Sequence, residues 1–135
     1  MIVLDASALV DVVVDQPTKG AVLAHLDQPV VAPAHQLAEV LSALARLVRA
    51  ETISAEAARD ALDEASLLEQ QHVTPSRGHL RRALELQANI RVLDGLYVAL
   101  AEERRCPLLT TDGRIAAAKP PCNVILARPP TANGR

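Results

Sequence analysis

The feature that most constrains the fold of this chain is an alternation of short β-like runs with segments of helical periodicity. The runs are rich in Val, Ile and Leu, and the segments between them repeat apolar residues three and four positions apart. Strands that alternate with helices form parallel sheets whose two faces are both covered by helices. The sequence therefore predicts an α/β fold: a single domain with a parallel sheet of about five strands sandwiched between helices.

Local signals place the individual elements. Pro17 suits the first turn of a helix with Asp15 or Gln16 as its cap, and Ser54 suits the cap of another helix. The expected strands cover residues 2–4, 29–34, 72–75, 107–112 and 123–127. The expected helices cover residues 6–14, 17–27, 35–49, 55–70, 79–88 and 93–105. The third and fourth of these helices should form an antiparallel hairpin.

The segment RVLDGLYV, residues 91–98, allows two interpretations. Asp94 and Gly95 form a common two-residue turn that would fit a β-hairpin. The continuation through Tyr97 and Ala101 into LAEERR favours a helix instead. We predict the helix, because a hairpin strand would have to end inside that continuous run.

Composition excludes several functional classes. The chain has 135 residues, half of them hydrophobic, which is enough for one buried core. Its only aromatic residue is Tyr97, which argues against modules that stack RNA bases on aromatic side chains. No apolar run reaches the roughly 18 residues of a membrane span, and the N-terminus lacks a basic signal region. We therefore expect a cytoplasmic protein in which Cys106 and Cys122 are buried thiols.

Charge is distributed unevenly along the chain, although the net charge is only −2. Residues 1–76 carry a net charge of −7, and residues 77–135 carry +5. The plain explanation is a scatter of solvated charges. The functional alternative is an RNA-binding rim of arginines that faces phosphates, made of Arg77, Arg81, Arg82 and Arg114.

Four acidic residues stand at the ends of expected elements. Asp5 directly follows the first strand, and Asp112 ends the strand in PLLTTD. Glu39 lies early in its helix and off the apolar stripe, and Asp94 begins another helix. Ligands of open parallel sheets bind beyond the carboxyl ends of the strands, so the four carboxylates could meet at one edge of the sheet.

Each acid also has a purely structural interpretation. Asp5 could cap the following helix, and Glu39 could complement the dipole of its own helix. Asp94 and Asp112 both precede glycine and could be turn or cap residues. The occurrence of all four together favours a functional site. So do the small hydroxyl residues beside the outer acids, which are Ser7, Thr110 and Thr111.

Four carboxylates in one pocket repel one another, and some would bind protons at neutral pH unless a cation compensated them. Ligands that are all oxygen select a hard ion such as Mg²⁺ or Mn²⁺. Such an ion lowers the pKa of an attacking water and stabilises charge on a phosphodiester. The pattern therefore predicts one set of residues as both catalytic and metal-binding, namely Asp5, Glu39, Asp94 and Asp112.

The stretches around these acids carry a family resemblance. They are IVLDASALVD around Asp5, APAHQLAEVLSAL around Glu39, LDGLYVALAE around Asp94 and CPLLTTDGRI around Asp112. Together they resemble a PIN-domain ribonuclease, and more narrowly the toxin of a VapBC-type toxin–antitoxin pair. The four stretches follow the order of that family and span nearly the whole chain.

The resemblance implies a Mg²⁺-dependent endoribonuclease, usually a homodimer, whose activity a cognate antitoxin blocks by covering the cleft. The substrate would be tRNA, rRNA or mRNA. The four acids carry over as the acidic set, with Ser7 and Thr111 as supporting groups that orient a ligand or water. The nuclease domain would cover residues 1–128, and residues 129–135 would form a flexible tail.

Two departures from the family pattern stand beside the acids. Leu93 and Gly95 occupy places where the family often has an aromatic residue and alanine. Glycine costs about 1 kcal/mol of helix propensity, so we expect Gly95 to loosen the segment that presents Asp94. Arg114 stands near the place where some relatives carry a further acid, which leaves open whether one or two ions bind.

Two other functional classes compete with the nuclease. A non-catalytic PIN-like module could bind RNA or a protein without cutting, but all four acids are present, which argues against loss of the site. Phosphotransfer through an aspartyl-phosphate fits poorly. A receiver domain needs paired acids after the first strand, and a haloacid dehalogenase needs an acid where Ser7 stands.

Overall fold

The protein is described by a computed structural model that covers residues 1–131. This part of the chain contains one five-stranded sheet with the order β3-β2-β1-β4-β5, in which every neighbouring pair is parallel. The predicted α/β fold class is therefore confirmed. The strands are β1 (Ile2–Leu4), β2 (Val30–Pro33), β3 (Gln71–Val73), β4 (Leu108–Thr110) and β5 (Val124–Leu126).

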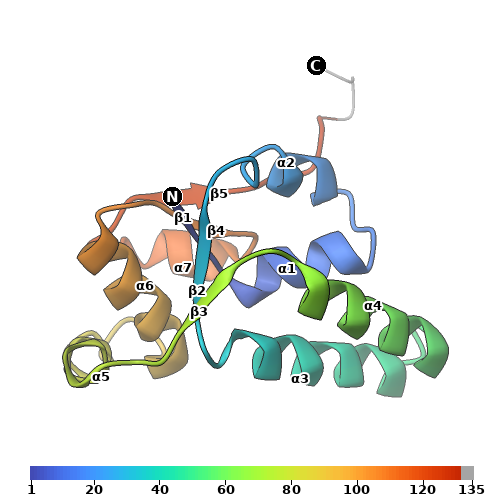
Figure 1. Cartoon of the computed structure of the whole chain (residues 1–135), viewed down its shortest axis with the longest axis horizontal. Coiled ribbons are helices and arrows are strands. Elements are labelled where there is room, and N and C mark those ends of the chain that lie inside the picture. The colour runs from blue at the N-terminus through green and yellow to red at the C-terminus, as the bar shows by residue number, and fades with distance from the viewer. Residues whose placement is uncertain (132–135) are drawn as a thin grey trace.

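Helices cover both faces of the sheet (Figure 1). One group packs on one face and contains α1 (Ala6–Val13), α2 (Lys19–Leu23), α3 (Gln36–Arg49) and α4 (Ala55–Leu67). The other face carries α5 (Arg77–Glu85), α6 (Val92–Arg104) and α7 (Gly113–Ala117). None of the helices in the described residues is long and apolar enough to cross a membrane.

Strand β1 shows why the sheet is covered on both sides. Ile2 and Leu4 point into the core beneath α1–α4, and Val3 points into the core beneath α6 and α7. All three side chains are fully buried. Each contributes about 1.5–3 kcal/mol through removal from water, so the strand is stabilised through both of its faces.

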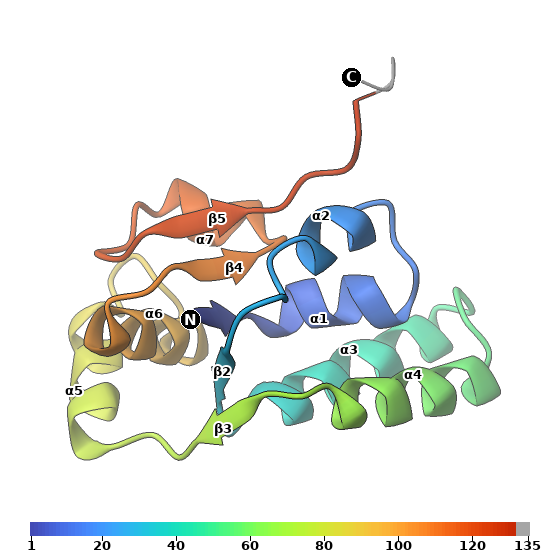
Figure 2. The same ribbon diagram turned by 45° about the horizontal axis from the view of Figure 1, so that its top comes forward.

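The predicted hairpin of two helices is confirmed. Helices α3 and α4 lie side by side in both views (Figure 1 and Figure 2). Val40 and Leu44 of α3 belong to the same buried cluster as Ala61 of α4. As predicted, Ser54 caps α4, because its hydroxyl accepts a hydrogen bond of 3.0 Å from the backbone N–H of Ala57.

The prediction of a helix over the contested segment is also confirmed. In α6, every residue from 94 to 101 is buried, since the helix lies between the sheet and α5. A hairpin at Asp94 and Gly95 would have buried only one face. The helix ends at Arg104, followed by Arg105 in the left-handed conformation with φ 52°.

Two helix starts differ from the predictions. Helix α2 is shorter than predicted and follows Thr18, not Asp15 or Gln16 as cap. Asp15 has a left-handed φ of 54° and instead forms an ion pair with Lys19. The side chain of Thr18 forms no capping hydrogen bond with the helix.

Helix α5 begins two residues before the predicted start, because Ser76 and His79 form a capping box that the prediction overlooked. The Ser76 hydroxyl accepts a hydrogen bond of 3.1 Å from the N–H of His79, and the N–H of Ser76 donates to the His79 ring at 3.0 Å. Helix α7 was not predicted at all. It has only five residues, too few for a periodicity to show.

The remaining differences lie at element ends and in side-chain burial. Helix α4 ends at Leu67 rather than at residue 70, because Gln70 exchanges hydrogen bonds of 2.8 and 3.1 Å with buried Gln36. Cys106 and Cys122 are free but only partly buried, not fully buried as predicted. In the predicted tail, residues 129–131 are exposed and lie outside helices and strands, and residues 132–135 lie outside the described residues.

Gly95 brings α6 into close contact with α5. A Cβ atom at this position would lie only 3.1 Å from both Cα and Cβ of Ala83. Because backbone atoms cannot move aside as a flexible side chain can, the absence of a side chain sets the spacing of the two helices. The close packing that glycine permits here therefore opposes the loosening that we expected from its low helix propensity.

We predict opposite effects for alanine at two helical glycines. Gly95→Ala should lower the free energy of unfolding by about 1–2 kcal/mol, because overpacking outweighs the gain in helix propensity. Gly78→Ala on exposed α5 should raise it by about 0.5 kcal/mol, since the new Cβ would make only ordinary contact with Ser76, at 3.6 Å. Urea denaturation of both variants measures the two effects. A Gly95→Ala variant as stable as Gly78→Ala would contradict the packing argument.

Candidate active site

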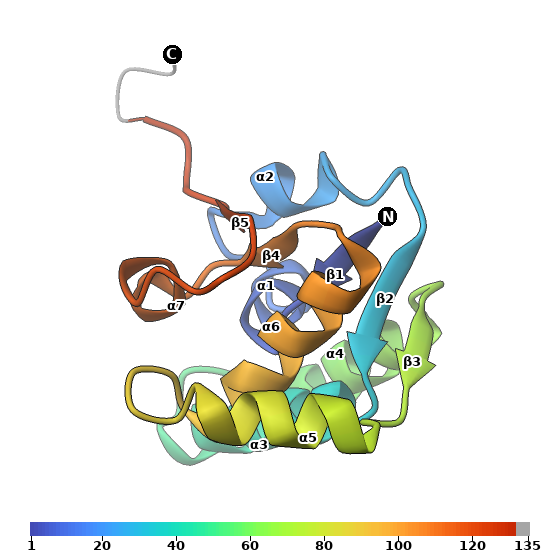
Figure 3. The same ribbon diagram turned by 90° about the vertical axis from the view of Figure 1, so that its left-hand side faces the viewer.

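Parallel pairing of β1 with β4 brings two of the four acids together. Leu4 lies opposite Leu109, and the N–H of Asp5 donates to the carbonyl of Leu109 at 2.9 Å. Asp5 and Asp112 therefore follow neighbouring strands at the same edge of the sheet. Figure 3 shows β2 and β3 pointing toward α3 and α5 at this end of the molecule.

All four predicted acids line one cavity of about 270 Å³. Asp5 and Asp112 reach it from strand ends, Glu39 from the first turn of α3, and Asp94 from the first turn of α6. The sequence thus predicted correctly which acids converge. The cavity is also lined by Asp11, which was not predicted, and by the side chains of Arg46, Arg91 and Arg114.

Asp5 is held by a buried network of hydroxyl groups. Its Oδ2 atom accepts hydrogen bonds from Ser7 Oγ at 2.6 Å and from Thr110 Oγ1 at 2.7 Å. The backbone N–H of Thr111 donates to Ser7 Oγ at 3.1 Å, and that of Asp112 donates to Thr110 Oγ1 at 3.0 Å. Ser7 thus supports Asp5 directly. Thr111 supports Asp5 only indirectly, through the hydrogen bond of its backbone N–H to Ser7. The second hydroxyl that donates to Asp5 belongs to Thr110.

Burial makes Asp5 unusual for a residue at a helix N-cap position. Only 4 % of the residue is exposed, and its side chain forms no capping hydrogen bond with α1. Burial raises the pKa of Asp5 to about 6, against the two hydroxyl hydrogen bonds, and the charges of Asp94 and Glu39 add to the increase. Ionisation of this carboxylate is unfavourable, and its side chain does not cap the helix. A role in binding a ligand therefore explains its position better than a role in stabilising α1.

Glu39 has two side-chain partners that the sequence did not predict. Tyr97 donates its hydroxyl to Glu39 Oε1 at 2.7 Å, and His35 Nε2 lies 3.2 Å from the same oxygen. Burial alone would raise the pKa of Glu39, but the hydrogen bonds of His35 and Tyr97 outweigh it and lower the pKa below its usual value. Because His35 Nε2 also lies 3.2 Å from the carbonyl oxygen of Leu93, that nitrogen carries the proton.

Asp94 and Asp112 each form an ion pair with an arginine. Burial raises the pKa of Asp94, although Arg91 Nε lies 3.3 Å from its Oδ2 and opposes the change. The pKa of Asp112 is lowered, mainly by the hydrogen bonds of Arg114, whose Nε and Nη2 donate at 3.2 and 3.0 Å. Asp112 also caps α7 through the N–H of Arg114 at 2.9 Å, so its structural interpretation is correct as well.

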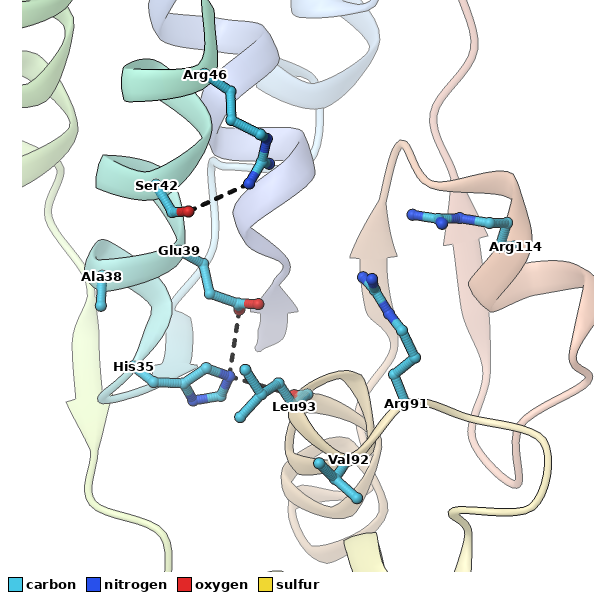
Figure 4. A pocket seen from close by; sticks show the side chains of 9 residues that line it. All are labelled: His35, Ala38, Glu39, Ser42, Arg46, Arg91, Val92, Leu93 and Arg114. Carbon is cyan, nitrogen blue, oxygen red and sulfur yellow. Dashed lines mark hydrogen bonds and ion pairs between the residues drawn. The ribbon is translucent and has the colours of Figure 1, made fainter.

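A larger groove of about 780 Å³ adjoins the acidic cavity (Figure 4). Its walls come from the start of α3, which carries His35, and from the start of α6, which carries the exposed side chains of Val92 and Leu93. In Figure 4 the guanidinium group of Arg114 points across the groove toward the side of α3, and that of Arg91 points into the space between the walls. On α3, Arg46 donates to Ser42 at 3.2 Å. The groove therefore combines an apolar wall with three cationic groups.

Only one of the four predicted arginines lies at this site. Arg114 lines both the acidic cavity and the groove. Arg77, Arg81 and Arg82 lie on α5 and line neither, and Arg82 forms ion pairs with Glu85 and Glu102. Sequence reasoning missed Arg46 and Arg91. Their spacing from the acids could have indicated them, because Arg46 follows Glu39 by about two helical turns and Arg91 precedes Asp94 by about one.

The donor set fits a hard divalent cation. Every acid contributes oxygen atoms, which are the ligands that hard cations prefer. Burial is the main cause of the raised pKa values of Asp5 and Asp94, and the charges of neighbouring acids add to it. Across residues 1–131, no three histidine, cysteine or acidic side chains already form a tight cluster of metal ligands. The described carboxylates are instead occupied by hydroxyl, histidine and arginine partners.

Comparison with known proteins identifies the family of this chain's relatives. The family model of the PIN domain matches residues 2–119. Ribonuclease VapC1 of Mycobacterium tuberculosis is 39% identical over 129 residues, which cover 93% of this chain and 97% of that protein. Ribonuclease VapC3 of the same organism is 41% identical over 130 residues, with 92% and 91% covered.

A solved structure shows the same fold at lower sequence identity. It is a toxin–antitoxin complex from Klebsiella pneumoniae, one chain of which superposes with a TM-score of 0.68. The match covers 96% of this chain and 99% of that chain at 17% identity. The likeness confirms the arrangement of sheet and helices.

We predict that Asp5→Asn stabilises the metal-free protein at high pH. The folded state keeps the Asp5 proton up to about pH 6, whereas the unfolded chain releases it near 3.8. The contribution of this group to stability therefore declines as pH rises through this window and stays low above it. Asparagine keeps an oxygen acceptor for Ser7 and Thr110 without the charge.

Urea denaturation in chelator should show the variant more stable by about 1–3 kcal/mol at about pH 8, with the difference shrinking toward about pH 4.5. Exposed Asp63→Asn on α4 removes the same charge outside the cavity and serves as the control. A variant less stable than the wild type at every pH would show that the ionised carboxylate contributes to folding.

Proposed function

The chain belongs to the PIN domain family, and we propose that it is a divalent-metal-dependent endoribonuclease that acts as the toxin of a toxin–antitoxin pair. The observation that carries this proposal is the convergence of Asp5, Glu39, Asp94 and Asp112 on one cavity of about 270 Å³. Relatives of nearly the same length that are about 40% identical are named ribonucleases, which supports the same reaction class here.

The four acids would hold Mg²⁺, with Mn²⁺ as a substitute, because a site of oxygen ligands selects hard cations. A bound ion would supply a more acidic water and stabilise negative charge on the phosphodiester. Ser7 and Thr110 fix the orientation of Asp5, and His35 with Tyr97 keep Glu39 ionised. Thr111 supports the site through its backbone N–H.

RNA would enter through the groove beside the acids. Its arginines supply positive charge for phosphates, and its volume of about 780 Å³ leaves room for more than the scissile group. The exposed side chains of Val92 and Leu93 offer an apolar surface for a base in a chain whose only aromatic residue is buried. Arg77 and Arg81 could extend phosphate binding only along a substrate that reaches α5.

The partners proposed for this protein are an RNA and a cognate antitoxin that covers the cleft, with the protein acting in the cytoplasm as a homodimer. The resemblance in the four motif stretches supports this assignment, as does the fold shared with a chain of a toxin–antitoxin complex. The nuclease domain is proposed to cover residues 1–128. A non-catalytic binding module is less well supported, since no member of the acidic set is missing.

We predict that purified protein cleaves labelled total RNA or tRNA with Mg²⁺ or Mn²⁺ and not with chelator. Asp94→Asn should reduce cleavage by roughly hundredfold or more, because it removes a charged ligand from the cavity while preserving the side-chain shape. Gel analysis of the fragments measures the loss, and the fragment ends identify the target.

Asp63→Asn on exposed α4 is the matched control and should cleave as the wild type does. Urea denaturation of Asp94→Asn checks that the variant is folded. Folded, antitoxin-free protein that cleaves none of these RNAs under any metal condition would favour the binding module instead.

A further inference from the structure

Two arginines stand where the cavities of the site meet. Arg91 and Arg114 line the acidic cavity, the adjoining groove and a third cavity of about 190 Å³. Arg46 lines only the first two of these. A substrate phosphate that moved from the groove to the acids would therefore pass both Arg91 and Arg114.

Both arginines are bound to carboxylates that the proposed cation would need. Arg114 donates to both oxygens of Asp112, at 3.2 Å to Oδ1 and 3.0 Å to Oδ2. Arg91 donates to Oδ2 of Asp94 at 3.3 Å. A carboxylate oxygen that accepts a guanidinium hydrogen bond has fewer electron pairs left for a metal ion, so cation and arginine compete for these two acids.

Little holds the two guanidinium groups in place. The side chain of Arg91 is 69% exposed and that of Arg114 is 77% exposed. Ion pairs of exposed side chains contribute little net stability, because water and dissolved salt screen them. Arg46 differs from both, since it donates to the neutral hydroxyl of Ser42 at 3.2 Å.

We propose that Arg91 and Arg114 are exchangeable counter-ions of the site. Each neutralises one carboxylate in the metal-free protein, and each binds a substrate phosphate once a divalent cation has taken that carboxylate. This inference rests on the proposed function and adds to it the residues that position the substrate and the condition under which they do so.

Exchange of this kind makes binding of metal and RNA mutually dependent. A cation that frees two guanidinium groups increases the positive charge available to phosphates, and a phosphate that holds these groups leaves the carboxylates open to the cation. Because the coupling of two binding free energies is reciprocal, each ligand must strengthen the binding of the other by the same factor.

The first test is calorimetric titration of Mn²⁺ into the protein, with four variants compared. Arg91→Ala/Arg114→Ala removes both counter-ions and should bind Mn²⁺ about tenfold more tightly than the wild type. Arg46→Ala removes an arginine of the same cavity that forms no ion pair with an acid of residues 1–131. Arg49→Ala/Arg59→Ala removes two exposed arginines that do not line the acidic cavity. Asp94→Asn should abolish or strongly weaken binding.

The second test measures binding of a short fluorescent 2′-O-methyl oligoribonucleotide, whose integrity a gel checks afterwards. Loss of Arg91 and Arg114 should weaken this binding more in saturating Mn²⁺ than in chelator, because the two groups reach phosphates only after exchange. Arg46→Ala should weaken it equally in both conditions.

The outcomes separate this inference from the proposed function. Tighter Mn²⁺ binding by the double variant than by Arg46→Ala or by Arg49→Ala/Arg59→Ala supports exchange. Equal or weaker binding by the double variant, with Mn²⁺ still bound by the wild type and lost in Asp94→Asn, overturns exchange and leaves the metal site intact. A wild-type protein that binds no Mn²⁺ overturns both the exchange and the metal-dependent function.

Discussion

The parallel pairing of β1 with β4 is the constraint on which the site depends. Neighbouring parallel strands end at the same edge of a sheet, so residues that follow them share one space whatever their separation in sequence. In this chain, Asp5 and Asp112 are brought together in that way. Helices α3 and α6 then begin beside the same edge and add Glu39 and Asp94. The arrangement of the backbone alone thus places four negative charges at one edge of the sheet, and other side chains must compensate them.

The protein compensates each carboxylate with a different kind of partner. Asp5 is the most buried and receives neutral hydroxyl donors, which cost less to bury than a cation. Glu39 is half-buried and receives a tyrosine and a histidine. Asp94 and Asp112 pair with arginines whose own side chains remain in water. The most buried carboxylate is thus held by neutral hydroxyl donors alone, whereas the cationic partners of Asp94 and Asp112 keep their own side chains in water.

The sequence was sufficient for the fold class and for the four acids, because both depend on local patterns that repeat along the chain. Strand ends, first helical turns and apolar spacing can be recognised without knowing the contacts. Ser7 was recognised in the same way as a group that supports the acids, but the pairing of residues far apart in sequence could not be predicted. Tyr97 and Glu39 are 58 residues apart, and Thr110 and Asp5 are 105 apart, so only the folded sheet brings each pair together. The start of α5 was missed for a simpler reason, since its capping box uses histidine in place of an acid or amide.

The contact between Gly95 and Ala83 has a consequence for how such a site can change. Asp94 is the neighbour of Gly95, and the helix that presents it packs on α5 with no side chain of its own at this contact, where it meets the Cα and Cβ atoms of Ala83. The position of Asp94 in the cavity thus depends on the spacing between α5 and α6, which is set by a contact outside the cavity. A single methyl group added at this contact would push α6 away from α5 and so displace the carboxylate of Asp94. Every residue that lines the cavity would stay the same.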